Sequence, residues 1–460
     1  MTNTFSRKIR LPLTSAMTFV LCGVAPLEAG SEPWSHHPSV QEADPLDELI
    51  EEAIAHNPEI RAAQSRVRAA EAGIPQAGAL PDPMLSVGLM NMPVPDFDLS
   101  REGMTMLSFE AGQRIPARGL RRARERIAGA ELGAARARVE VVRWSVVTRL
   151  QEAYFELLLV VQAEEVHYRT HATLEAFASS AETAFVQGLA PQQDILRAQT
   201  ELAGIEEHLA ELRQRRSSAL AQVNSLLGRP SRSPIDPILP ERTRALLGAE
   251  PGPGILTSRL TDAELGGGFP TLAELQEEAG HRRPELELAQ HRAEAARHEL
   301  EAARRDRRPG VTLMAGYGVR SGRQDMLSAG ISIDLPVFRG RKQDQAVLRA
   351  QHARDAEDLG AESVRRQVRQ EVAEAHADLV RAREQVLLLE EGVLPQARAT
   401  VESAAAAYRA GEIAFVSLME AYAVLFRNEI ELAHLTAGLG REMARLEQAV
   451  GADITMENSR

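Results

Sequence analysis

The strongest constraint on the fold of this 460-residue chain is an internal duplication. The stretch "NPEIRAAQ" from Asn57 has a counterpart in "RPELELAQ" from Arg283, and "SLLG" before residue 229 has one in "QAVG" before residue 452. Between these, "FVQGLAPQQDILRAQ" around Gly188 parallels "YRAGEIAFVSLMEAY" around Gly411. Self-similarity at a fixed offset indicates one structural unit present twice. We predict a first repeat over residues 31–228, a Pro- and Gly-rich linker over 229–270 and a second repeat over 271–460.

Each repeat contains a long segment with helical periodicity. Apolar positions such as Leu150, Tyr154 and Leu157 recur at steps of three and four residues, which is the seam of a coiled coil. No proline interrupts the stretch from about residue 117 to 187, so a helix of ~100 Å is predicted there. Aromatic residues make up only 4% of the chain, as in proteins built from extended helices. Each repeat should run helix, β-hairpin, very long helix, Gly turn, helix.

The two hairpins, at about 84–113 and 310–337, have strands with two unlike faces. Leu85, Val87 and Leu89 alternate with polar, small or Met residues, and the second hairpin has the same parity. One face suits lipid and the other water, as in a membrane β-barrel. Four strands cannot close a barrel, so several chains must contribute; the alternative is two soluble hairpins packed on a helical body. The residues predicted to face the lumen are Met84, Met90, Met92, Met104, Met106, Glu110, Met314 and Asp334.

Residues 1–30 have the layout of a secretory signal peptide, with basic residues ahead of an apolar run from residue 11 to about 25. Export is therefore predicted. Cys22, the single cysteine, lies in this segment and is expected to be removed with the signal peptide. The alternative is lipidation of Cys22. A lipoprotein site needs small residues just before the cysteine, whereas Phe19, Val20 and Leu21 precede it here.

The chain shows none of the signatures of an enzyme or a nucleic-acid-binding protein. There is no GxSxG, HExxH or phosphate-loop motif, so we expect no catalytic residues and no cofactor. The net charge of −12 argues against a nucleic-acid partner.

The chain resembles the TolC family of outer-membrane efflux factors in the order of its features. These are the stretch "LDELIEEAIAHNPEIRAAQSRVRAAEAGIPQAGALPDP", two hairpins, two Gly turns and the "SLLG" and "QAVG" ends. The resemblance implies a homotrimer in which each chain gives four strands to a twelve-stranded outer-membrane β-barrel and long coiled helices to a periplasmic α-barrel. It also implies a passive conduit, docked through a periplasmic adaptor (a membrane fusion protein) onto an inner-membrane efflux pump. A drug-efflux or type I secretion conduit of the same fold, and a non-conducting periplasmic coiled-coil scaffold, remain as alternatives.

The resemblance also suggests functional residues at the helical end. The adaptor-docking tips correspond to Gly188, Leu189, Ala190, Gly411, Glu412 and Ile413, and the periplasmic gate to Gln193, Asp194, Ser417 and Glu420. Two residues depart from the best-known pattern of the family's gate. Ile413 stands where that pattern has a basic residue that locks Asp194, and Ser417 stands where it has one ring of acidic residues. A weaker or differently locked gate is therefore expected. The alternatives are an ordinary Gly helix cap at each tip and a solvated charge at Glu420.

The methionines on the predicted lumen face give an indication of which substrate the conduit transports. The stretch "PDPMLSVGLMNMPVPDFDLSREGMTM" resembles the heavy-metal branch of the family, whose pumps expel copper, silver, cobalt, zinc or cadmium. Thioethers suit soft Cu(I) and Ag(I), which makes Met84, Met90 and Met106 candidate metal contacts. His36 and His37 near the mature N-terminus could add a weak contact. The alternative is that Met is flexible filler where barrel and helices meet.

Overall fold

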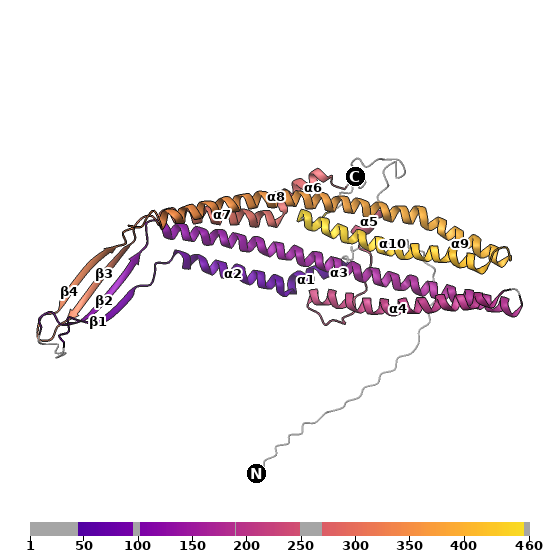
Figure 1. Ribbon diagram of the computed structural model, residues 1–460, viewed down its shortest axis with the longest axis horizontal. Helices are drawn as coiled ribbons and strands as arrows, with labels where there is room; N and C mark the ends of the chain where they lie inside the picture. Colours follow the sequence, from indigo (N-terminus) through magenta and orange to yellow (C-terminus); the bar gives the residue numbers. More distant parts are fainter. Residues whose placement is uncertain (1–44, 95–101, 189, 249–268, 455–460) are drawn as a thin grey trace, which may run out of the picture. The chain divides into compact units, whose positions relative to one another are not determined.

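The computed structural model describes residues 45–94, 102–188, 190–248 and 269–454, and it is mostly helical with one four-stranded sheet (Figure 1). The two repeats have the same order of elements. The first contains α1 (Pro45–His56), α2 (Pro58–Gly78), β1 (Met84–Met90), β2 (Met106–Ile115), α3 (Leu120–Val186) and α4 (Gln192–Leu227). The second contains α6 (Leu272–Arg282), α7 (Pro284–Arg305), β3 (Val311–Val319), β4 (Met326–Ile333), α8 (Gln343–Leu387), the π-helix η1 (Leu388–Val393), α9 (Leu394–Arg409) and α10 (Phe415–Val450). The prediction of a mainly helical chain with four strands is confirmed.

The helix before each hairpin is divided in two, where the sequence suggested one. Asn57 and Arg283 both have extended backbones, with ψ of 127° and 115°, and each precedes a proline that starts the next helix. Proline disfavours a helical conformation in the residue before it and fits the first helical position, so α1 ends at His56 and α6 at Arg282, and the prolines begin α2 and α7. Asn57 also caps α2 by accepting a hydrogen bond from Glu59 N at 2.8 Å.

The long helix α3 is the element around which the others are arranged. It packs against α2, α4, α7 and α10 (Figure 1). Its predicted seam residues Leu150, Tyr154 and Leu157 are all buried, because a three- and four-residue spacing keeps them on one side of the helix. At 67 residues it is ~100 Å long.

The corresponding helix of the second repeat is interrupted, which the sequence analysis did not foresee. Pro395 has no N–H to bond to the carbonyl four residues earlier, and the π-helix η1 lies directly before it. A wider helical turn, with more residues per turn, therefore separates α8 from α9, while α3 has no such break.

The described part of the linker packs against both repeats. It contains a short helix, α5 (Glu241–Gly248), and Tyr154 Oη both donates to Ile238 O and accepts from Ile238 N at 2.9 Å. Residues 249–268 of the predicted linker lie outside the described residues. Within the described chain, no helix is both long enough and apolar enough to cross a lipid bilayer.

Candidate functional site

The four strands form one antiparallel sheet in the order β1-β2-β3-β4. The register pairs Met84 with Gly112, Gly112 with Met314 and Met314 with Gly330. Since directly paired residues share a face, this register assigns every strand residue to one side of the sheet.

One side of the sheet, which we call the apolar face, carries only apolar and aromatic residues apart from Gln113. It comprises Leu85, Val87, Leu89, Leu107, Phe109, Ala111, Gln113, Ile115, Val311, Leu313, Ala315, Tyr317, Val319, Leu327, Ala329, Ile331 and Ile333. Most of these side chains are uncovered in the single chain: Leu85 is 75% exposed and Leu327 82% exposed, while Gln113 and Val311 are half-buried. A contiguous apolar surface of this extent indicates contact with lipid or with another protein surface.

The opposite side, which we call the methionine face, combines Met with Ser, Gly, Thr and two charged residues. It comprises Met84, Ser86, Gly88, Met90, Met106, Ser108, Glu110, Gly112, Arg114, Thr312, Met314, Gly316, Gly318, Met326, Ser328, Gly330 and Ser332. Asp334, just past β4, accepts a hydrogen bond from Arg114 Nη2 at 3.1 Å. In the described loop between β1 and β2, Met92 is half-buried and Met104 exposed.

The three candidate metal contacts do not form one site. Met84 and Met314 both reach Gly112, where an added Cβ would lie 4.0 Å from Met84 Cε and 3.9 Å from Met314 Cγ. Met90 instead lies opposite Met106, six residues along β1 from Met84, or ~20 Å. In the described part of the chain, no three His, Cys, Asp or Glu side chains come together as a metal site.

The two predicted tips have the same backbone geometry. Gly188 and Gly411 both have φ of 74°, a left-handed conformation that favours glycine. Gly188 N donates to Phe185 O at 2.9 Å and Gly411 N to Tyr408 O at 3.0 Å, so each glycine ends a helix. Leu189 lies outside the described residues, Ala190 and Ile413 are half-buried, and Glu412 is exposed.

Of the four predicted gate residues, only Asp194 is buried; Gln193, Ser417 and Glu420 are exposed. The two tips share a core that contains Leu174, Ala181, Ala198, Ile205, Leu209, Phe415 and Met419. Burial raises the pKa of the Asp194 carboxyl, against the opposing effect of Arg197. Burial, and then the charge of Asp194, raises the pKa of Tyr408. Asp194 is therefore electrostatically coupled to the other tip in the single chain.

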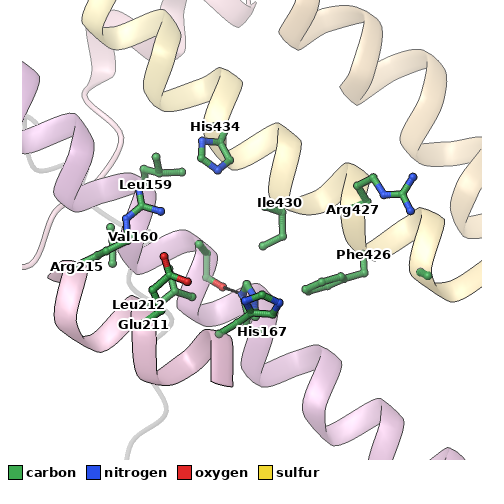
Figure 2. Close-up of a pocket in the computed structure, with 13 residues that line it drawn as sticks. Leu159, Val160, His167, Glu211, Leu212, Arg215, Phe426, Arg427, Ile430 and His434 are labelled. Carbon is green, nitrogen blue, oxygen red and sulfur yellow. Dashed lines mark hydrogen bonds between the residues drawn. The ribbon is translucent and has the colours of Figure 1, made fainter. Parts of the chain in front are cut away.

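A groove with three histidines lies between α3, α4 and α10, and sequence reasoning missed it. The cavity has a volume of about 390 Å³ and is lined by His167, His208 and His434 together with apolar residues and the charged residues Glu211, Arg215 and Arg427 (Figure 2). His167 Nδ1 lies 2.8 Å from Ala163 O, and its ring packs edge-on against Phe426 at 5.0 Å between centroids. Burial, and also His208, lowers the pKa of His167, while the Ala163 carbonyl opposes the shift.

A buried carboxyl cluster joins the two repeats and the linker, and it too was missed. Glu447 of α10 is 1% exposed; it accepts hydrogen bonds from Gln151 Nε2 at 3.1 Å and Arg242 Nη1 at 3.3 Å. Burial raises the pKa of Glu447 to about 7, with Arg242 opposing the shift and Asp453 adding to it. No signal in the sequence links these residues, because the cluster forms only when α3, α5 and α10 meet.

Residues 1–44 lie outside the described residues. The predicted signal peptide, the alternative of lipidation at Cys22 and the suggested metal contacts at His36 and His37 therefore stay predictions.

Comparison with known proteins identifies the family. A model of the outer membrane efflux protein family matches residues 49–229 and 275–452, one segment in each repeat. Protein CyaE of Bordetella pertussis is 26% identical over 373 residues, which cover 77% of this chain and 74% of that protein.

Solved structures of outer-membrane proteins share the fold. The outer-membrane channel OprN matches with a TM-score of 0.71 and 21% identity over 89% of this chain and 90% of that one. The outer membrane protein VceC from Vibrio cholerae matches with a TM-score of 0.72 and 21% identity over 90% and 97%. The chain therefore belongs to the outer membrane efflux protein family, and it shares its fold with these solved outer-membrane proteins.

Proposed function

We propose that the protein is the outer-membrane conduit of a tripartite efflux system. Three copies would combine their sheets into a twelve-stranded barrel through which substrate passes from the periplasm to the exterior. The conduit is passive and needs neither a cofactor nor catalytic residues.

The observation that carries this proposal is the combination of a bare apolar face with two open sheet edges. In the described chain, β1 and β4 are each paired on one side only, and a sheet inside a bilayer must have all its backbone groups paired. Closure with other copies satisfies both needs, since it pairs every edge and turns the apolar face to lipid. The methionine face then lines the lumen.

We assign the Gly188 and Gly411 turns to contact with a periplasmic adaptor, and through it with an inner-membrane pump. Asp194 would contribute to a gate at this end, together with Gln193, Ser417 and Glu420 from exposed positions. The burial of Asp194 beside the other tip favours a gate held by packing as well as by charge. This agrees with the expectation of a differently locked gate, since Ile413 cannot supply the positive charge that locks Asp194 in the family's best-known pattern.

For the cargo we propose soft metal ions, above all Cu(I) or Ag(I), delivered by a pump of the RND type. Five methionines share the methionine face, and thioether sulfur is a ligand that these ions prefer. Met84 with Met314, and Met90 with Met106, would be transient contacts along the lumen. Drug efflux and type I protein secretion are the competing cargoes of the same conduit.

Disulfide cross-linking between copies tests the trimer directly. In a Cys22→Ala background, Ser86→Cys on β1 is combined in turn with Ser328→Cys or Ser332→Cys on β4. At least one pair should yield a covalent trimer on oxidation. The matched control combines Ser86→Cys with Gly316→Cys on the central strand β3, which no neighbouring copy can reach. Chains that stay monomeric with every edge pair would contradict the shared barrel.

The cargo is tested by deleting the gene and measuring tolerance of copper, silver, zinc and common drugs. Complementation with a Met84→Leu, Met106→Leu variant should restore drug tolerance fully and silver tolerance only in part. Unchanged metal tolerance in the deletion strain would exclude the metal cargo and leave the conduit itself unaffected.

A further inference from the structure

A large basic cavity lies at the foot of the apolar face, where the strands give way to helices. Its volume is about 910 Å³, and it lies between the β2–α3 and α7–β3 connections. Ile115 and Val311, which are paired in the register, form part of its wall and belong to the apolar face. The cavity thus continues the surface that faces lipid in the proposed barrel, and it opens at the periplasmic end of that surface.

The lining of this cavity is strongly cationic. It contains Arg118, Arg121, Arg122, Arg126 and Arg305 against two acidic residues, Glu125 and Glu301.

Part of this positive charge is already used within the chain. Arg126 lies 2.6 Å and Arg305 3.3 Å from Glu301, and Arg121 Nε donates to Gly78 O at 2.6 Å. Arg118 and Arg122 are exposed, and neither forms an ion pair with any other described residue. Two guanidinium groups therefore remain for a ligand.

The first turn of α3 adds to the attraction for an anion. The helix begins after Gly119, whose φ of 85° turns the chain, and no side chain caps it. Uncapped N–H groups carry the positive end of the helix dipole, and Gly119, Arg121 and Arg122 all line the cavity. Phosphate groups bind at such helix ends, here reinforced by arginine side chains.

The connection between β4 and α8 resembles the one between β2 and α3 in that apolar residues are followed by basic ones. After β4, Leu335, Val337 and Phe338 are more than 70% exposed, and Arg339, Arg341 and Lys342 follow. The three connecting segments 114–126, 301–308 and 334–344 hold thirteen basic and five acidic residues, in a chain whose net charge is −12. Apolar side chains followed by Arg and Lys are the arrangement of residues anchored at the head-group level of a membrane.

We propose that the cavity lined by Arg118 and Arg122 binds the phosphate of an anionic phospholipid in the periplasmic leaflet of the outer membrane. The lipid chains would lie along the apolar face above Ile115 and Val311. This inference rests on the proposed function, which sets the sheet in the bilayer with the helices on the periplasmic side.

Retention of lipid by the intact protein tests the proposal. The full chain is purified in a non-ionic detergent, and its binding of phosphatidylglycerol or of zwitterionic phosphatidylethanolamine is measured by native mass spectrometry. Phosphatidylglycerol should bind in preference. Arg118→Gln, Arg122→Gln should weaken that binding by about fivefold for each charge, or about twenty-five-fold together.

Three controls separate this site from general charge effects. Arg365→Gln, Arg369→Gln removes two exposed arginines at the same spacing on α8 and should leave lipid binding unchanged. Arg118→Lys, Arg122→Lys retains the charge and should retain most of the affinity, which excludes misfolding as the cause of the loss. Inorganic phosphate should not displace the lipid, because it lacks the chains that contact the apolar face.

Each contrary result has a distinct meaning. Equal binding of the two lipids, equal losses in the α8 control, or full displacement by inorganic phosphate would overturn the lipid site. If the protein still conducts ions in a planar bilayer, the proposed function stands without the lipid site. If no oligomer forms and no conductance is seen, the proposed function fails and this inference fails with it.

Discussion

Replacing Glu447 by Gln should remove a pH dependence from the junction of the two repeats. Glu447 is buried, and its pKa of about 7 lies well above the ordinary value of 4.5. A carboxyl with a raised pKa binds its proton more tightly in the folded chain than in the unfolded one. Its favourable contribution is therefore complete below about pH 4.5 and is lost as the pH rises through about 7.

The size of the effect follows from the shift in pKa. At about 1.4 kcal/mol per unit, ionising Glu447 costs the folded state up to about 3 kcal/mol above neutral pH. Glutamine has nearly the same shape and cannot ionise. The variant should therefore match the wild type at about pH 4 and be more stable by up to about 3 kcal/mol at about pH 8.

Hydrogen exchange of the last turns of α10 and of α5 is the appropriate assay, because it reports the opening of this junction locally. A difference of about 3 kcal/mol corresponds to roughly hundredfold slower exchange in the variant at the higher pH. Comparison of variant and wild type at each pH cancels the intrinsic pH dependence of exchange. Glu431→Gln, an exposed position on the same helix, is the matched control and should show no difference.

The reasoning would be refuted if Glu447→Gln exchanged faster than the wild type at both pH values. That result would mean that the pair with Arg242 stabilises the junction more than burial of the carboxylate destabilises it.

The remaining predictions concern other contacts of the fold. Tyr154→Phe should cost about 1–3 kcal/mol, because it removes two hydrogen bonds to the linker backbone, and faster exchange over residues 235–248 would report it. Gly411→Val should destabilise the second tip by about 1–2 kcal/mol through its left-handed backbone, seen as local exchange near residue 411 and weaker adaptor binding. Leu313→Arg should cost about 2–4 kcal/mol and reduce membrane assembly, while the neighbouring Met314→Arg should assemble normally and change conductance and metal passage. His167→Phe should make the packing of α3 against α4 less sensitive to acid. Because the pKa of His167 is lowered in the folded chain, the wild type loses stability as the pH falls through that pKa, and phenylalanine cannot be protonated; hydrogen exchange of α3 and α4 at low pH would show the difference.

The sheet illustrates what the sequence could predict. A period of two residues is a local property, so the faces of Leu85 and Met84 followed from alternation alone, and the register agrees with that parity. The pairing of β2 with β3 joins residues about 200 positions apart. Only that pairing shows that both hairpins contribute to one continuous apolar face and to one continuous methionine face.

The helices show where local reasoning stops. The length of α3 followed from its lack of proline, but Pro58 and Pro284 were each read within a single helix although proline disfavours helix in the preceding residue. The π-helix before Pro395 was missed because the heptad spacing continues through it.

The clusters of polar residues could not be predicted from the sequence at all. Gln151, Arg242 and Glu447 each look like an ordinary helix-surface residue in the sequence, and only the meeting of three helices buries them together. The three histidines of the groove come from three helices in the same way.

Several copies of this chain are proposed to form a pore, and ion conductance measured together with particle mass tests that proposal. The protein purified in detergent should have the mass of a trimer, and it should produce discrete steps of conductance in a planar lipid bilayer. A monomer that stays dissolved without detergent and produces no conductance would contradict the account.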